Sequence, residues 1–271
     1  MGDTTTVPDF AEEFADAADS FAELDGVLWD PISTAAVSRS HPRFDERVLD
    51  ACCGDGASAL PTAELVGVGG LVDAVDVTES LIAVARNRAG ERMPQLRFHV
   101  ADATTWEPTG YDLVQCVLGV FFFPDVDAGI RHLIERAKPG GRVAITVWAK
   151  GAFDPLPELL VSSLPGGDDE SGAGGETAPP PEVAGTAGNL AHWLTELGLV
   201  GVRAEAVQRH LDVTPDLAWR LVQGTAWRAA VSSLDENEQA AVRERFLAAI
   251  AEHDVQRVDL TTLIAVGQRP E

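Results

Sequence analysis

The first 150 residues of the chain alternate between short apolar runs and stretches with helical spacing. The apolar runs are bounded by glycine, proline or acidic positions, which is typical of β-strands. Five strands are expected, at 48–51, 71–77, 96–103, 111–120 and 142–148. Helices are expected between them, at 57–66, 79–89 and 126–137, the last ending at a Lys-Pro-Gly-Gly stop. Because crossovers between parallel strands are right-handed, this alternation predicts a doubly wound, mostly parallel α/β sheet.

The pattern changes after Trp148. Residues 164–185 are rich in Gly, Pro and acidic positions and lack the apolar content that offsets ordering entropy, so a surface loop is expected. Beyond it the sequence predicts a helix at 189–199, a strand at 200–213, helices at 215–231 and 235–253, and a strand at 255–268. The last two strands would complete a seven-stranded sheet, with the helix pair inserted between them as a lid.

Four regions follow from these changes. They are an N-terminal helical cap (1–45), an α/β core (46–150), a flexible acidic Gly- and Pro-rich loop (151–186), and a C-terminal part (187–271) that completes the sheet and carries a helical lid (215–254). Ligands of doubly wound sheets bind outside the carboxyl ends of the strands. The turn after residue 51, together with Asp76 and Asp102, is therefore expected along one edge.

The charge balance restricts the partners. The formal net charge is −23, from 43 acidic and 20 basic residues, and only Lys138 and Lys150 are lysines. This charge repels nucleic acid and anionic lipid. The longest apolar runs fall short of the roughly 18 to 20 residues of a membrane span. We therefore expect a cytoplasmic protein without nucleic-acid or membrane partners, of unknown oligomeric state.

The stretch VLDACCGDGASAL (48–60) contains two of the three cysteines, Cys52, Cys53 and Cys116. These offer no metal-ligand spacing and no even disulfide framework. Successive side chains of an extended segment point to opposite faces, so Cys52 and Cys53 cannot readily share a metal or form an ordinary disulfide. No metal is expected, and the cysteines are interpreted as small buried apolar residues.

The glycines of the same stretch leave two interpretations open. Gly54, Gly56 and Ala59 fit the dinucleotide fingerprint, with Asp76 as the acid about 20 residues on. Alternatively, the glycines admit an adenosyl group without a pyrophosphate, and Asp76 accepts from both ribose hydroxyls.

Four ordered segments resemble the motifs of class I S-adenosylmethionine (SAM) dependent methyltransferases, in the small-molecule, type 11 or UbiE-like group. They are VLDACCGDG (48–56), VDAVDVTESLIAVA (72–85), VADAT (100–104) and the segment from Tyr111 to Trp148. The resemblance implies a Rossmann-like core over 46–150 with SAM as cofactor, and it makes an NAD-dependent oxidoreductase the weaker alternative. One position departs from the family, because Cys52 stands where the turn usually has its first glycine.

The resemblance also implies roles for individual residues around SAM. Asp50 and Ala51 would border the methionyl part, which Gly54 and Gly56 would admit close to the backbone. Asp76 would hold the ribose, with Val77 on the adenine. The remaining implied contacts are Asp102 and Ala103 at the adenine amino group, and Cys116 and Val117 at the methionine amine.

The reaction would transfer a methyl group to an O, N or C nucleophile of a small organic acceptor. Alignment and exclusion of water would supply most of the catalysis, and only a hydroxyl or similar acid needs a general base. No histidine lies in a catalytic motif, and His41 and His210 are weak candidates for a base.

Acceptor recognition is expected outside the motif core, where aromatic residues occur that could build either a pocket or a core: Trp29, Phe121, Trp219 and Trp227. A planar or apolar acceptor is favoured, and the Ala-, Arg- and Asp-rich composition suggests specialised metabolism. A SAM-binding partner without catalytic activity is the alternative from another class.

Overall fold

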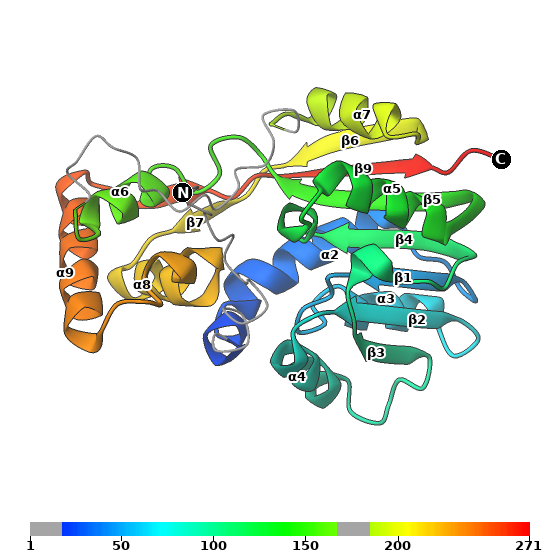
Figure 1. Cartoon of the computed structure of the whole chain (residues 1–271), viewed down its shortest axis with the longest axis horizontal. Helices are drawn as coiled ribbons and strands as arrows, with labels where there is room; N and C mark the ends of the chain where they lie inside the picture. Colours follow the sequence, from blue (N-terminus) through cyan, green and yellow to red (C-terminus); the bar gives the residue numbers. More distant parts are fainter. Residues whose placement is uncertain (1–17, 167–184) are drawn as a thin grey trace, which may run out of the picture.

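The computed structural model describes residues 18–166 and 185–271 and contains a seven-stranded sheet (Figure 1). Its strand order is β3 (Leu96–Val100), β2 (Leu71–Asp76), β1 (Arg47–Ala51), β4 (Tyr111–Val117), β5 (Ala137–Trp148), β9 (Thr262–Gln268) and β6 (Val200–Val207). Neighbours among β1 to β5 pair in parallel, whereas β9 is antiparallel to both of its neighbours. The predicted doubly wound, mostly parallel sheet is confirmed. The strand order reverses between β1 and β4, the place where such sheets bind ligands.

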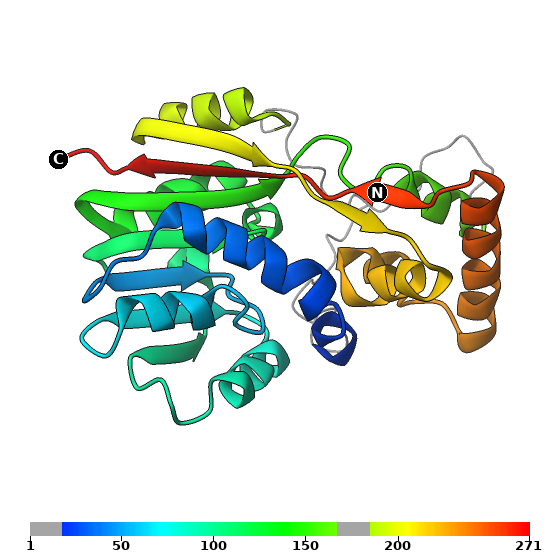
Figure 2. The ribbon, with the colours of Figure 1, turned by 180° about the vertical axis from the view of Figure 1, so that it is seen from behind.

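Helices cover both faces of this sheet. Successive side chains of a strand point to opposite faces, so the apolar strands present apolar side chains on both. Leu49 packs in a core with α5 (Val126–Arg136) and α7 (Ala187–Glu196), and Val48 packs on the opposite face against α3 (Ala59–Val66). The helix α4 (Glu79–Ala89) follows β2, and α2 (Asp30–Ser40) crosses the face seen in Figure 2.

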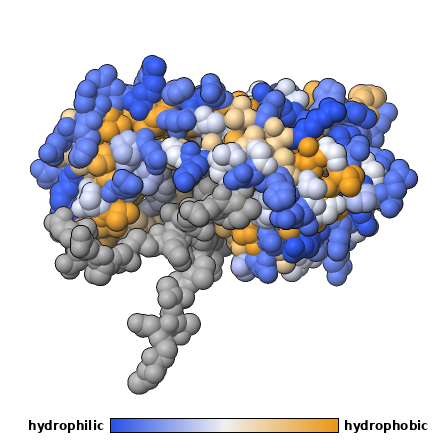
Figure 3. Space-filling model, turned by 90° about the horizontal axis from the view of Figure 1, so that it is seen from above, coloured by the Kyte–Doolittle hydropathy of each residue, from blue (hydrophilic) through white to orange (hydrophobic). Residues whose placement is uncertain are grey.

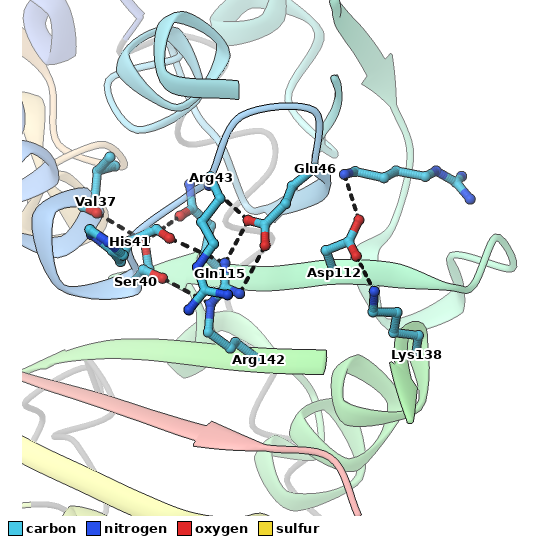
Figure 4. A network of polar contacts seen from close by, with 10 residues as sticks. Val37, Ser40, His41, Arg43, Glu46, Asp112, Gln115, Lys138 and Arg142 are labelled. Atoms are coloured by element: carbon cyan, nitrogen blue, oxygen red, sulfur yellow. Dashed lines mark hydrogen bonds and ion pairs between the residues drawn. The ribbon is translucent and has the colours of Figure 1, made fainter. Parts of the chain in front are cut away.

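The end of α2 is fixed at the amino edge of the sheet (Figure 4). Arg142 donates to both carboxylate oxygens of Glu46, at 2.9 and 2.6 Å, and to the backbone carbonyls of Ser40 and His41. His41 ends the helix with a left-handed φ of 54°. These bonds tie the N-terminal cap to Glu46, just before β1, and to Arg142 within β5.

A second hydrophobic core lies beyond the carboxyl edge of the sheet. It is built from η1 (Asp25–Trp29), α6 (Leu156–Ser163), α8 (Pro215–Gly224), α9 (Glu236–Glu252), and a two-stranded ribbon of β7 (His210–Asp212) and β8 (Arg257–Asp259). The expected lid is thus part of a packed second layer that also includes N-terminal residues (Figure 1).

Two strand predictions were too long. The expected strands at 200–213 and 255–268 each divide, because the chain leaves the main sheet after Val207 and re-enters it at Thr262. Between these points β7 and β8 pair with each other, and Leu211 and Val258 turn into the second core. The alternating pattern continues through the division, so the sequence does not mark it.

The expected helix at 215–231 is also wrong beyond Gly224. A side-chain carbon on Gly224 would lie 2.4 Å from the carbonyl oxygen of Ser20, so α8 packs directly on the cap. Thr225 is extended (φ −128°, ψ −177°), and its hydroxyl caps a short 3-10 helix, η5 (Ala226–Ala230). Trp219 and Trp227 therefore do not share one helical stripe.

The predicted loop at 151–186 is wrong for its first part, since α6 occupies 156–163 and buries Leu156, Leu159 and Leu160. Residues 167–184 lie outside the described residues. No helix within 18–166 and 185–271 is long and apolar enough to cross a membrane. Hydrophilic side chains cover much of the face in Figure 3, in keeping with the high net charge. The cytoplasmic location and the absence of a nucleic-acid partner stay predictions.

Candidate functional site

The glycine turn lies at the carboxyl edge, between β2 and β4. Ala51, the last residue of β1, pairs with Val75 and Cys116. Gly54 and Gly56 then adopt φ values of 52° and 89°, which favour glycine. A side-chain carbon on Gly56 would lie 3.3 Å from Cβ of Ala85, so α4 packs close to the turn. The absence of a side chain at Gly56 therefore allows α4 to pack against the turn at the end of β1.

The two adjacent cysteines point to opposite faces, as expected from their spacing. Cys52 packs with the α5 core and Cys53 with Ile82 of α4. Cys52 takes a left-handed φ of 57°, unusual for a residue with a side chain. All three cysteines are free thiols. A hydrogen bond with Cys116, together with burial, raises the pKa of Cys52, and burial raises the pKa of Cys53.

Asp76 connects the turn to the end of β2. One carboxylate oxygen accepts from the backbone N–H of Gly54 and the other from that of Thr78, both at 2.9 Å. Burial raises the pKa of Asp76, and the two backbone donors oppose this rise. The Thr78 side chain also bonds to this carboxylate, and because a carboxylate offers about four acceptor positions, Asp76 can still receive a hydroxyl group. Val77, the next residue, is 48% exposed on the edge.

The other predicted cofactor residues are spread along the same edge. Asp102 follows β3, is exposed, and accepts at 2.7 Å from both the backbone N–H and the hydroxyl of Thr104. Ala103 is buried beneath it. Cys116 is fully buried at the end of β4, and Val117 is half-buried against the second core.

Asp50 is fully buried below the turn. Its Oδ2 accepts from the Ser58 hydroxyl at 2.7 Å, and its Oδ1 is buried without a hydrogen-bond partner among the described residues. Burial raises the pKa of Asp50 to about 7, against the opposing effect of Ser58 and Gln115. The orphaned oxygen, the bare glycine turn and the open acceptor positions of Asp76 fit a ligand with ammonium and hydroxyl donors, as SAM has.

Three charged residues near the turn were missed by the sequence analysis. Asp55 lies between the two glycines and is buried, and Arg88 of α4 pairs with it and with Asp25 of η1. No local pattern marks this set, because its members come from three separate segments.

Neither histidine candidate makes a hydrogen bond or ion pair with the glycine turn in the described part of the chain. His41 is exposed at the amino edge, the opposite end of the strands from the turn. His210 is exposed on the ribbon, because its neighbour Leu211 points into the second core.

The aromatic candidates for the acceptor pocket lie in different parts of the fold. Trp219 is only 9% exposed and belongs to the second core. Phe121 packs on the first core, and Trp29 stacks on Phe21 with ring centroids 4.5 Å apart.

Trp227 belongs to an aromatic row that the sequence analysis did not find. Trp227 meets Phe153 edge to face at 5.1 Å, and Phe153 meets Trp148 at 4.8 Å. The sequence marked Trp227 as a candidate for the acceptor pocket and Trp148 only as the end of an expected strand, and nothing marked Phe153.

The sheet order and the glycine turn with its acids define a Rossmann-like SAM-dependent methyltransferase. Residues 48–141 match the family model described as a methyltransferase domain. The chain is 31% identical over 170 residues to aklanonic acid methyltransferase DauC of Streptomyces sp. (strain C5), covering 61% of this chain and 77% of that protein. The chain belongs to the class I SAM-dependent methyltransferases. The predicted family, enzyme class and cofactor are confirmed, and the NAD and non-catalytic alternatives are not favoured.

Further relatives and solved structures agree. Nocamycin O-methyltransferase of Saccharothrix syringae is 28% identical over 183 residues, covering 66% of this chain and 63% of that protein. The structure of YcgJ from Bacillus subtilis has a TM-score of 0.58 at 17% identity, over 88% of this chain and 98% of that one. Phosphoethanolamine N-methyltransferase 2 of Haemonchus contortus, solved with SAM, has a TM-score of 0.60 at 16% identity, over 98% and 61%. These two structures support the fold.

Proposed function

We propose that this methyltransferase transfers the methyl group of SAM to a carboxylate oxygen of a planar small molecule. SAM supplies an electrophilic methyl group on its sulfonium, so the protein contributes binding, alignment and exclusion of water. The relatives named for aklanonic acid and nocamycin support a small acceptor that carries oxygen nucleophiles.

The cofactor would lie across the carboxyl edge, in the order that the family resemblance implies. Asp50 and Ala51 would border the methionyl part, and the bare backbone at Gly54 and Gly56 would allow close approach. Asp76 would accept from the ribose hydroxyls with the acceptor positions left by its two backbone bonds.

The adenine and methionine ends would be held by the remaining edge residues. Val77, Asp102 and Ala103 would surround the adenine, whereas Cys116 and Val117 would line the methionine end.

The aromatic row carries the proposal of a planar acceptor. Val117, at the end of β4, pairs with Thr146 of β5, and Trp148 lies two residues further along β5. Val117 and Trp148 both pack against the second core, where Phe153 and Trp227 continue the row. Trp148 and Trp227 are half-buried, so their rings can offer a flat surface beside the methionine end.

The contacts of the histidines favour a carboxylate over a hydroxyl as the acceptor group. His99 bonds to Asp73, His132 to the Trp106 carbonyl, and His253 to the Ala249 carbonyl. His192 pairs with Glu196 on the surface of α7, His41 lies at the amino edge of the sheet, and His210 is exposed on β7. A hydroxyl acceptor is most often assisted by a histidine base, whereas a carboxylic acid is already ionised at neutral pH.

The test uses pairs of planar aromatic acceptors that differ in one group. Each carboxylic acid is incubated with SAM and enzyme beside its carboxamide and its phenol, and products are identified by mass spectrometry. Methyl ester formation from the acid alone supports the proposal, and methylation of the phenol or of carbon overturns the carboxylate assignment. The Asp76→Ala variant serves as a control, because loss of its charge-assisted bonds should weaken SAM binding by about 30-fold or more.

A further inference from the structure

Residues 18–30 of the N-terminal cap lie directly over the glycine turn. The Phe21 ring lies 3.6 Å from the place where a side chain on Gly54 would begin. Phe21 stacks on Trp29 at an interplanar angle of 13°, and the Trp29 indole N–H donates to the Phe21 carbonyl at 3.0 Å. The face of Gly54 that is bare of side chain is thus covered by a ring from the cap.

Arg88 of α4 joins the cap to the turn. Its guanidinium lies 2.9 Å from the Asp25 carboxylate and 2.8 Å from that of Asp30, and it also pairs with Asp55 between the two glycines. The side chain of Asp55 is 1% exposed and that of Asp25 is 21% exposed, so these pairs are shielded from water. One cation from the core therefore connects two acids of the cap with one of the turn.

We propose that residues 18–30 form a lid over the cofactor turn, and that Arg88 is the positioning residue that holds the lid closed in a pH-dependent way. The inference rests on the proposed cofactor site. With the lid closed, the Phe21 ring covers Gly54, so entry or release of the cofactor requires Phe21 to leave the turn.

The proton on Asp25 determines the direction of the pH dependence. Burial and the neighbouring Asp55 raise the pKa of Asp25 to about 8, although Arg88 opposes this rise. Below that pH, protonated Asp25 can donate to Asp55, and the ionised carboxylates of Asp55 and Asp30 share Arg88. Above it, three carboxylates, one each from η1, the turn and α2, face a single guanidinium. Raising the pH through about 8 therefore loosens the lid.

The experiment measures two quantities between about pH 6.5 and about pH 9.5, a range that spans the shifted titration of Asp25. They are the association rate of S-adenosylhomocysteine, the demethylated product, and the amide protection factors of residues 18–30 without ligand, that is, exchange rates corrected for the base-catalysed intrinsic rate at each pH. In the wild type the association rate should rise, and the protection factors should fall, by about five- to tenfold across this range, in line with usual coupling between sites.

Three variants separate the lid from general effects of pH. Arg88→Gln should give fast association and fast exchange at every pH. Asp25→Asn is close in shape and cannot ionise, so it should abolish the pH dependence. Arg86→Gln is the matched control on the same helix, because Arg86 is exposed and donates only to the Phe98 carbonyl in the described contacts; it should behave as the wild type.

The outcomes distinguish the lid from the site beneath it. Failure of the wild type to bind S-adenosylhomocysteine at any pH would overturn the proposed cofactor site. Normal binding with the same pH profile in wild type and Asp25→Asn would overturn the lid alone. Should Arg88→Gln not fold, the Asp25→Asn comparison still decides the matter.

Discussion

Cys52 and Gly119 occupy one shared space at the carboxyl edge. A side-chain carbon on Gly119 would lie 2.3 Å from Cβ of Cys52 and 2.9 Å from its Sγ, closer than atoms can approach. The turn therefore accommodates a cysteine where its family usually has glycine, because a glycine lies opposite on the segment after β4.

This pairing predicts a compensating pair of substitutions. Gly119→Ala should lower the free energy of unfolding by about 1–3 kcal/mol through overpacking, since the φ of −110° at Gly119 itself suits alanine. Cys52→Gly should change it by no more than about 1 kcal/mol, because relief of the left-handed strain is offset by a more flexible unfolded chain. The double variant should recover most of the loss. Urea unfolding of all four proteins gives the coupling, and strict additivity of the two changes would contradict the shared space.

The burial of Asp50 predicts that the free energy of unfolding depends on pH. Its folded pKa of about 7 lies above the ordinary 3.8, so its contribution to stability is fully present below pH ~4 and is lost as the pH rises through ~7. Asp50→Asn removes this loss, and it should be more stable than the wild type at pH ~8.5 by an amount on the order of a few kcal/mol. Near pH ~5 the difference should vanish or reverse.

Denaturation series across this pH range check the Asp50 prediction. Ser58→Ala is the control, because it removes the hydroxyl that donates to Asp50 but leaves the carboxyl group able to ionise. Parallel stability curves for wild type and Asp50→Asn would mean that Asp50 is ionised in the folded protein throughout.

The environment of Tyr111 predicts a distinct ultraviolet titration of its hydroxyl group. Its hydroxyl donates to Asp73 and accepts from the Trp106 indole N–H, both at 2.9 Å. Burial raises its pKa to about 12, and it is the single tyrosine of the chain. An ultraviolet titration of tyrosinate should therefore show one transition well above pH ~10, moving to the ordinary value on unfolding.

The same hydroxyl should stabilise the fold. Tyr111→Phe leaves the Trp106 N–H without its partner and should cost about 1–3 kcal/mol of unfolding free energy. SAM affinity should not change, because Tyr111 lies at the first residue of β4, far from its carboxyl end. A transition at the ordinary tyrosine pKa in the folded protein would contradict the burial of the Tyr111 hydroxyl.

The sequence predicts the core better than the surroundings of the site, for physical reasons. Strands β1, β2 and β4 and the second half of β5 are largely buried on both faces, so their continuous apolar runs identify them. The turn residues Gly54, Gly56 and Asp76 are adjacent to those strands, so their place at the edge follows from the topology. The Cys52 and Gly119 pair, the Arg88 connection and the Trp148 row instead join segments distant in sequence. Only the folded chain brings them together, and no local periodicity records them.

The aromatic row gives the last prediction, which separates pocket from core. Trp148→Leu and Trp227→Leu keep apolar character but remove the flat rings, so the acceptor KM should rise while SAM affinity stays nearly unchanged. Trp219→Leu is the matched control, because this tryptophan is buried in the second core and should lower stability with normal kinetics once folded. Loss of one ring contact should raise KM by about 2- to 10-fold, from roughly 0.5 to 1.5 kcal/mol per aromatic pair. Steady-state kinetics against acceptor, calorimetry with SAM and thermal unfolding on each variant supply the three readouts. A rise in acceptor KM for Trp219→Leu, with none for Trp148→Leu and Trp227→Leu, would place the acceptor inside the second core and away from the row.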